Sequence, residues 1–201
     1  MSILTRRVRW AQPFLMDWTI MPITVTAKAW VDSAFKSALL SSPDVTLQQM
    51  SRRWPHTIAF TLHEDTSTTR NLPLPVYKTS LQGLSDADLL SLAQDETGGD
   101  ETLEYFLPAR VIVKAFVDPQ FKSDLLTDAN LALNGMGYDT GYATYTVHEN
   151  TASSHHLALQ VNPLSQQDLS FEDLVNRLLS AVGSGSTKCC ASGTCDDDDD
   201  R

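Results

Sequence analysis

The sequence predicts an α+β fold made of two copies of one unit, each a helix, a β-hairpin and a second, capped helix. Two observations support this prediction. Three blocks of sequence recur in the same order at a spacing of 85 or 86 residues. Within each copy, helical periodicity gives way to an alternation of apolar and polar residues, which is typical of strands. We interpret the chain as a tandem duplication of a unit of about 75 residues.

The repeat is visible by direct alignment. "AKAWVDSAFKSALL", which begins at residue 27, aligns with "VKAFVDPQFKSDLL" at residue 113, and nine of the fourteen positions are identical. "FTLHEDTSTTRNLPLPV" at residue 60 aligns with "YTVHENTASSHHLALQV" at residue 145, and "LSDADLL" at 84 with "LSFEDLV" at 169. The predicted organisation is an N-terminal extension (1–23), a first unit (24–99), a linker (100–108), a second unit (109–185) and a disordered tail (186–201).

The first block of each unit is predicted to be helical. In the first copy an apolar stripe runs from Val31 to Leu39, with Asp32 and Lys36 four residues apart outside it. In the second copy Asp118 and Pro119 have the order of an N-cap followed by proline at the first helical position. The buried stripe expected there consists of Val117, Phe121 and Leu125.

The second block predicts two strands. Ile58 to Leu62 and Leu72 to Val76 alternate in the first copy, and 143–147 and 157–161 do so in the second. A polar turn separates the strands of each pair, so we expect a hairpin in each unit. Pro73 and Pro75 lack amide donors, which favours an edge strand.

The third block predicts a short capped helix. Ser85 with Asp88, and Ser170 with Asp173, have the spacing of a capping box. Glycine follows in both copies, in "TGGD" and in "VGSGS".

Composition excludes several classes of function. The chain is 42% hydrophobic and 20% charged, with a formal net charge of −10. An acidic balance argues against binding nucleic acid or an anionic membrane surface. No run of about 18 apolar residues predicts a membrane span. Asp17 and Pro13 interrupt the apolar segment after Arg6 and Arg7, which argues against a signal peptide, so we expect a cytoplasmic protein.

Histidines are the main candidates for chemistry in the first 185 residues. His63-Glu64 and His148-Glu149 recur at equivalent positions, a pattern that fits either acid–base catalysis or a strand end, and we favour the strand end. His155-His156 could bind a metal, but adjacent strand residues point to opposite faces. We therefore expect no catalytic residues, no metal, no other cofactor and a protein that is not an enzyme.

A family resemblance follows from these motifs. "ARVIVKAFVDPQFKSDLL" followed by "TVHENTASSHHLALQV" resembles the alpha subunit of nitrile hydratase. It resembles more closely the nitrile-hydratase-type leader peptides, which belong to precursors of ribosomally made, post-translationally modified peptides such as proteusins and thiazole/oxazole-modified microcins, a group of natural products that includes bacteriocins. "LSDADLLSLAQDETGG" is similar to the helix and double-glycine cleavage site that end those leaders.

The hydratase itself holds its metal with a C-x-x-C-S-C cluster. The corresponding places here read "LALQVNPLSQ" (157–166) and "LPLPVYKTSL" (72–81), and neither contains a cysteine. The resemblance therefore implies the fold without the thiolate metal site.

The resemblance also implies a role for the C-terminal tail, "STKCCASGTCDDDDDR". A leader peptidase or peptidase–exporter would cut near Gly183, Ser184 and Gly185, with Gly98 and Gly99 as a degenerate first site. A cyclodehydratase, lanthionine synthetase or radical enzyme would modify the core, and the mature peptide would be exported. The residues that carry modifiable groups are Ser186, Thr187, Cys189, Cys190, Ser192, Thr194 and Cys195.

Two alternatives remain open at this point. The three cysteines and five aspartates could instead form a metal-chelating tail for Cu(I) or Zn(II) on a non-catalytic binding protein. A metalloprotein similar to the nitrile hydratase alpha subunit is the other alternative. The run "DDDDDR" is also typical of a solvated acidic tail or a protease tag.

Overall fold

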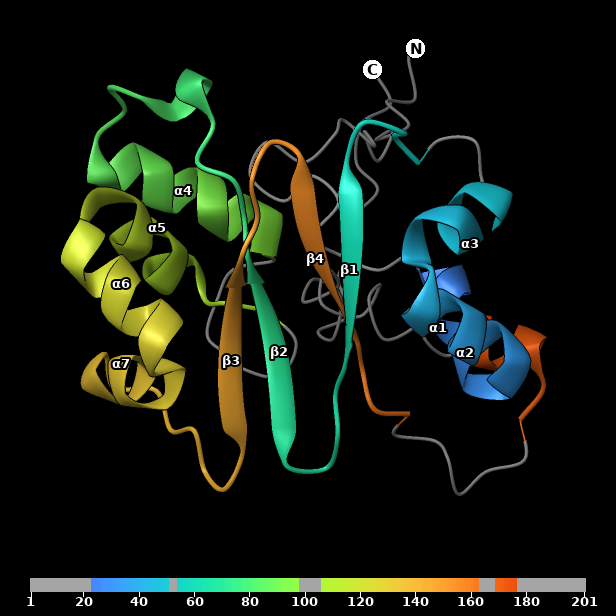
Figure 1. Cartoon of the computed structure of the whole chain (residues 1–201). Helices are drawn as coiled ribbons and strands as arrows, with labels where there is room; N and C mark the ends of the chain where they lie inside the picture. Colours follow the sequence, from blue (N-terminus) through green and yellow to red (C-terminus); the bar gives the residue numbers. More distant parts are fainter. Residues whose placement is uncertain (1–22, 51–53, 98–105, 163–168, 177–201) are drawn as a thin grey trace, which may run out of the picture.

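The computed structural model describes residues 23–50, 54–97, 106–162 and 169–176, which place two groups of helices on either side of four strands (Figure 1). None of the helices in these ranges has both the length and the apolar character needed to cross a membrane. The elements are α1 (Ile23–Val31), α2 (Ser33–Ser41), α3 (Pro43–Met50), β1 (Ala59–Glu64), β2 (Thr69–Leu74), η1 (Thr79–Leu81), α4 (Asp86–Thr97), α5 (Ala109–Val117), α6 (Pro119–Thr127), α7 (Ala129–Gly135), β3 (Thr144–Glu149) and β4 (Ser154–Leu159). The mixture of helices and strands confirms the α+β prediction.

The strands pair differently from the prediction. β1 pairs in parallel with β4, and β2 pairs in parallel with β3, so each two-stranded sheet takes one strand from each half of the chain. Leu62 lies opposite Leu157 and Leu72 opposite Val147. The predicted hairpins are therefore wrong. An apolar–polar alternation specifies a strand and its faces, but it carries no information on which strand is its partner.

The turn after β1 explains why no hairpin forms there. The Asp65 amide donates to the Leu159 carbonyl (2.9 Å), which extends the pairing of β1 with β4 past the end of the strand. The equivalent Asn150 amide donates to the Leu74 carbonyl (3.0 Å) beside β2 and β3. The chain then crosses to the other sheet, because Asp65 and Asn150 also accept amides six residues ahead.

The first block of each half spans two short helices where one was predicted, and a third helix, α3 or α7, follows it. Asp32 accepts a hydrogen bond from the Phe35 amide (2.8 Å) and caps α2, so α1 ends at Val31. Asp118 caps α6 in the same way (3.0 Å), which confirms the predicted N-cap with proline after it. Val117 is 44% exposed, contrary to the predicted stripe, because it lies at the break between α5 and α6.

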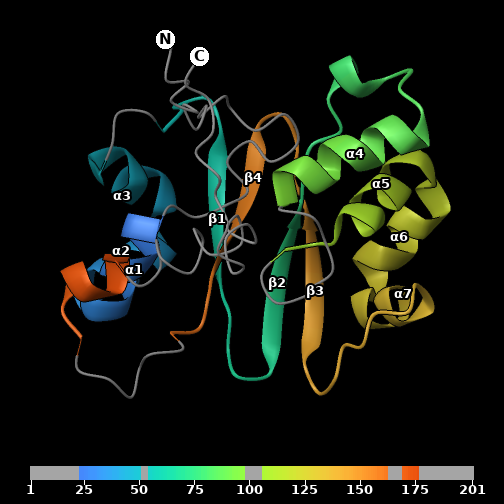
Figure 2. The same cartoon turned by 180° about the vertical axis from the view of Figure 1, so that it is seen from behind.

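Two hydrophobic cores flank the sheets, and Figure 2 shows the same layers from behind. The β2–β3 sheet packs on α4 to α7, with Leu72, Leu74 and Val147 buried among them. The β1–β4 sheet packs on α1 to α3 through residues that include Leu62 and Leu157. The capping box is confirmed at the start of α4, where the Asp88 amide donates to the Ser85 hydroxyl (3.2 Å).

The two halves repeat their local contacts as well as their elements. Ile23 and Ala109, which begin α1 and α5, are 86 positions apart, and β1 and β3 begin 85 positions apart. The ion pair of Lys36 with Glu64 has its counterpart in Lys122 with Glu149. The Phe60 amide donates to Asp44 and the Tyr145 amide to Asn130, both at 2.7 Å.

Candidate functional site

A cluster of histidines lies where the two sheets face each other. In β1, Phe60 and Leu62 point toward the helices and are buried, so His63 points to the opposite face. His156 in β4 and His148 in β3 follow the same alternation. His63, His148 and His156 thus come from three strands, and all three side chains are half-buried.

The three rings are close and nearly parallel. The centroids of His63 and His148 are 3.7 Å apart, with an interplanar angle of 12°. His156 lies 5.2 Å from His63 and 5.1 Å from His148, at angles of 27° and 22°. His63 Nε2 and His156 Nδ1 are 2.9 Å apart and share one hydrogen bond.

A series of hydrogen bonds through the side chain of Asn71, in β2, supports the cluster. Asn71 Nδ2 donates to Asp65 Oδ1 (3.0 Å) and to the Glu64 carbonyl (3.3 Å), so Asn71 Oδ1 is left as the acceptor. His148 Nε2 lies 2.9 Å from that oxygen and donates to it. Asp65 is 6% exposed, and its burial raises the pKa of the carboxyl group against the opposing effect of its hydrogen bonds with Asn71.

Burial keeps the cluster uncharged. Desolvation, followed by repulsion from His63 and His156, lowers the pKa of His148 to about 4. The pKa of His63 is lowered by burial and then by His156, and that of His156 by burial. At pH 7 the three imidazoles are therefore neutral, and each has one nitrogen with a free lone pair in the ring plane. Such rings can bind a metal ion or accept a proton.

The prediction that adjacent histidines point to opposite faces is confirmed, whereas the cluster was not predicted. His155 and His156 do point to opposite faces, because His155 is buried and its ring contacts Phe60 edge-on at 6.0 Å. His156 shares the β1–β4 sheet with His63, whereas His148 comes from the other sheet, and His63 comes from the other half of the chain. One signal could have suggested the contact: His63 and His148 occupy equivalent positions, and such positions meet when two similar halves interlock.

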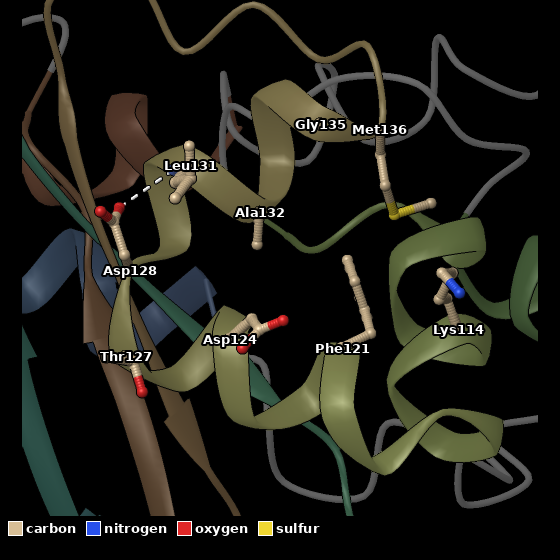
Figure 3. Close-up of a pocket in the computed structure, with 9 residues that line it drawn as sticks. All are labelled: Lys114, Phe121, Asp124, Thr127, Asp128, Leu131, Ala132, Gly135 and Met136. Carbon is tan, nitrogen blue, oxygen red and sulfur yellow. Dashed lines mark hydrogen bonds between the residues drawn. The ribbon is translucent and has the colours of Figure 1, made fainter.

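A second concave surface lies over α5, α6 and α7 (Figure 3). This groove of about 510 Å³ contains the side chains of Phe121, Leu131 and Met136, and Leu131 is 71% exposed. Its polar groups already have structural roles, since Asp128 caps α7 and Lys114 pairs with Asp118. The nine lining residues include no histidine or cysteine.

The cleavage and core residues predicted from the sequence lie outside the described residues. These are Gly98, Gly99, Gly183, Ser184, Gly185, Ser186, Thr187, Cys189, Cys190, Ser192, Thr194 and Cys195. The N-terminal extension up to residue 22 also lies outside them, as does the helix predicted for 169–182 beyond residue 176. Within 169–176, Ser170 and Asp173 make the predicted capping contact, with the Asp173 amide 3.2 Å from the Ser170 hydroxyl.

The thiolate metal site of a nitrile hydratase does not fit this chain. The resemblance implies that its place is at residues 157–166 and 72–81, which contain no cysteine; all three cysteines of the chain lie at 189, 190 and 195. Leu157 and Leu159 are buried in the core beside α1 to α3, where they offer no donor atoms. We therefore assign no step to a hydratase metal.

Comparisons with known proteins agree with the resemblance to the nitrile hydratase alpha subunit, and none of them tests the closer resemblance to leader peptides. A family model described as "Nitrile hydratase, alpha chain" matches residues 83–162, which span α4 to β4. An Fe-type nitrile hydratase from Comamonas testosteroni Ni1 with two histidine-to-alanine substitutions is 20% identical, with a TM-score of 0.46 over 77% of this chain and 65% of that chain. A thiocyanate hydrolase mutant is 10% identical, with a TM-score of 0.44 over 76% and 65%. A comparison with curated proteins gives no match.

This chain thus spans about 65% of the length of the solved structures that it matches. The expectation that the protein is not an enzyme is wrong on these findings, because the matched family model describes the alpha chain of an enzyme. The missing cysteines exclude the thiolate site and do not exclude other chemistry. Residues 83–162 are nitrile hydratase alpha-like in sequence, within a fold of mixed helices and strands.

Proposed function

We propose that this chain is the precursor of a ribosomally made, post-translationally modified peptide. Its nitrile hydratase alpha-like part acts as a folded leader, duplicated in tandem, and the tail from about residue 186 is the core. The leader presents the core to a modifying enzyme, and a peptidase cuts near Gly183 to Gly185 before export. The chain is thus a substrate of other enzymes, and this role does not depend on any reaction of its own.

The observation that carries this proposal is the distribution of thiols. All three cysteines lie within seven residues of one another near the C-terminus, among Ser186, Thr187, Ser192 and Thr194. Cysteine, serine and threonine are the side chains that become thiazolines, oxazolines or thioether rings. Modifying enzymes require an extended substrate, and a composition rich in glycine, serine and aspartate suits that requirement.

The strand arrangement supports a role for both copies in the leader. Each sheet requires one strand from each half, so the first copy is needed to complete the fold even though "DETLEYFLPAR" after it offers no cysteine or serine to modify. This accounts for the retention of a first unit without a core of its own.

The test is co-expression with the modifying enzymes encoded beside the precursor, followed by mass spectrometry of the C-terminal fragment. We expect loss of water, in steps of about 18 Da, at residues between 184 and 195. A variant with Cys189, Cys190 and Cys195 replaced by alanine is the control for thiazoline or thioether formation, because alanine can neither cyclise nor be dehydrated. An unmodified tail in the presence of all these enzymes contradicts the proposal, and tight Zn(II) binding by that tail would favour the chelating alternative.

A further inference from the structure

We propose that His63, His148 and His156 form a binding site for one divalent transition-metal ion of the Zn(II), Ni(II) or Cu(II) class. One donor atom from each ring lies within 4.8 Å of the others. Imidazole nitrogen is a preferred ligand of these ions. The site goes beyond the precursor role and uses imidazole nitrogens instead of thiolates.

His148 already has the tautomer that a metal ligand requires. Because its Nε2 donates to Asn71 Oδ1 (2.9 Å), a neutral His148 carries its lone pair on Nδ1. Asn71 is held in turn by Asp65 and the Glu64 carbonyl. Metal-ligating histidines almost always donate their second ring nitrogen to such a partner, which fixes the tautomer and the direction of the ring.

His63 and His156 offer the other two ligands. Their facing nitrogens are 2.9 Å apart and have one proton between them. A metal ion can take the place of that proton when both rings carry their hydrogens on the outer nitrogens. Two nitrogens bound at about 2.0–2.1 Å in tetrahedral geometry are about 3.3 Å apart, so this pair has to open by only a few tenths of an ångström.

The rings have to rotate to complete the site. Imidazole lone pairs lie in the ring plane, and the stacked planes of His63 and His148 differ by only 12°, so the lone pairs of these two rings do not converge. Rotation about the Cβ–Cγ bonds makes the lone pairs converge and does not move the strands. The backbone of His63 stays paired opposite Ala158, and that of His148 opposite Pro73. Metal binding therefore requires that the rings of His63 and His148 are no longer stacked.

The surroundings suit a cation. All three histidines are half-buried, so an ion can enter from solvent. The Asp65 carboxylate lies behind Asn71 and offsets part of the added charge. Three protein ligands also leave a fourth position for water, as in catalytic zinc sites.

The test is a titration of the full chain in which Cys189, Cys190 and Cys195 are replaced by serine, so that the tail thiols do not compete. Binding of Zn(II) is measured by calorimetry, and Cu(II) is used as an electron paramagnetic resonance probe of nitrogen ligands. We expect one ion per chain. His63→Gln, His148→Gln and His156→Gln should each weaken binding at least about tenfold, and Asn71→Leu by about 10- to 100-fold.

His56→Gln is the matched control, because His56 is exposed and outside the cluster. It should bind as the parent does, and circular dichroism checks that each variant is folded. Absence of saturable binding, or binding that folded His148→Gln and His156→Gln retain at full strength, overturns the proposal. Because the titrated variant has no thiols in its tail, the result does not depend on whether the precursor role is correct.

Discussion

The rings of His63 and His148 stack at a centroid distance of 3.7 Å, although the two residues are 85 positions apart and belong to equivalent strands in the two halves of the chain. The contact exists because β1 and β3 lie in different sheets whose inner faces meet. Each sheet is completed by a strand from the other half. The histidine cluster is therefore a product of the interlocked arrangement, and no single half can form it.

Neither half should fold alone as a monomer. A fragment of residues 1–104 lacks β4 and loses the partner of β1, along with Leu157 and Leu159 from the core around α1 to α3. We expect fragments 1–104 and 105–201 to lack a cooperative urea transition separately and to regain it when mixed, as followed by circular dichroism. The intact chain cleaved between 98 and 105 is the control and should stay assembled. A single fragment that unfolds cooperatively as a monomer would contradict the interlocked fold.

Stability should fall as the pH decreases below about 6.5. The folded-state pKa of His148 is about 4 and lies below the ordinary histidine value of 6.5, so the unfolded chain binds protons first on acidification. The stabilising contribution is complete above pH 6.5 and is lost as the pH falls toward 4. Urea unfolding in EDTA at pH 7.0 and 5.5 measures the loss. His148→Gln should reduce it and His56→Gln should not; equal losses in the two variants would be evidence against the buried cluster.

Asn71→Leu should destabilise the fold by about 1–3 kcal/mol, because it removes hydrogen bonds from the buried Asp65 and from His148. Replacing His148 by leucine in the same chain removes both partners of one bond. The double variant should then lose less stability than the sum of the two single variants. Urea denaturation of the four proteins gives the coupling, and strict additivity would show that the bond between Asn71 and His148 is absent in solution.

Asp32→Ala and Asp118→Ala should have similar effects, each a loss of about 1 kcal/mol, because each aspartate caps the second helix of its half. Gln120→Ala is a control on the exposed surface of α6 and should change stability by less than about 0.5 kcal/mol. Chemical denaturation distinguishes the cases. Loss of stability in only one of the two aspartate variants would mean that the halves are not equivalent.

Local sequence patterns predicted where helices and strands form, but they could not predict which strands pair with each other. Ser85 and Asp88 form the expected capping contact, and Asp118 starts a helix as its sequence indicates. Asp32 caps a helix in the first copy as well, but the stripe predicted from Val31 to Leu39 runs across the break between α1 and α2. Short-range alternation placed Leu62 and Leu157 on buried faces and could not reveal that they lie side by side, because parallel pairing joins residues that are distant in sequence.

The histidine cluster could likewise be predicted only in part. Alternation places His63 on the face opposite Leu62, and this follows from sequence alone. What lies against that face depends on the topology. His156 and His148 reach it from strands more than 80 residues away, and no local spacing reports such a contact.

The most direct measurement of the central claim compares modification of the whole chain with modification of its tail. The same modifying enzyme is supplied with either the full chain or a synthetic peptide of residues 184–201, and mass spectrometry follows the loss of water over time. If the folded part presents the tail, the full chain is modified and the free peptide reacts at least about tenfold more slowly, a difference of about 1.4 kcal/mol. Equal rates, or no modification of either substrate, would contradict the account.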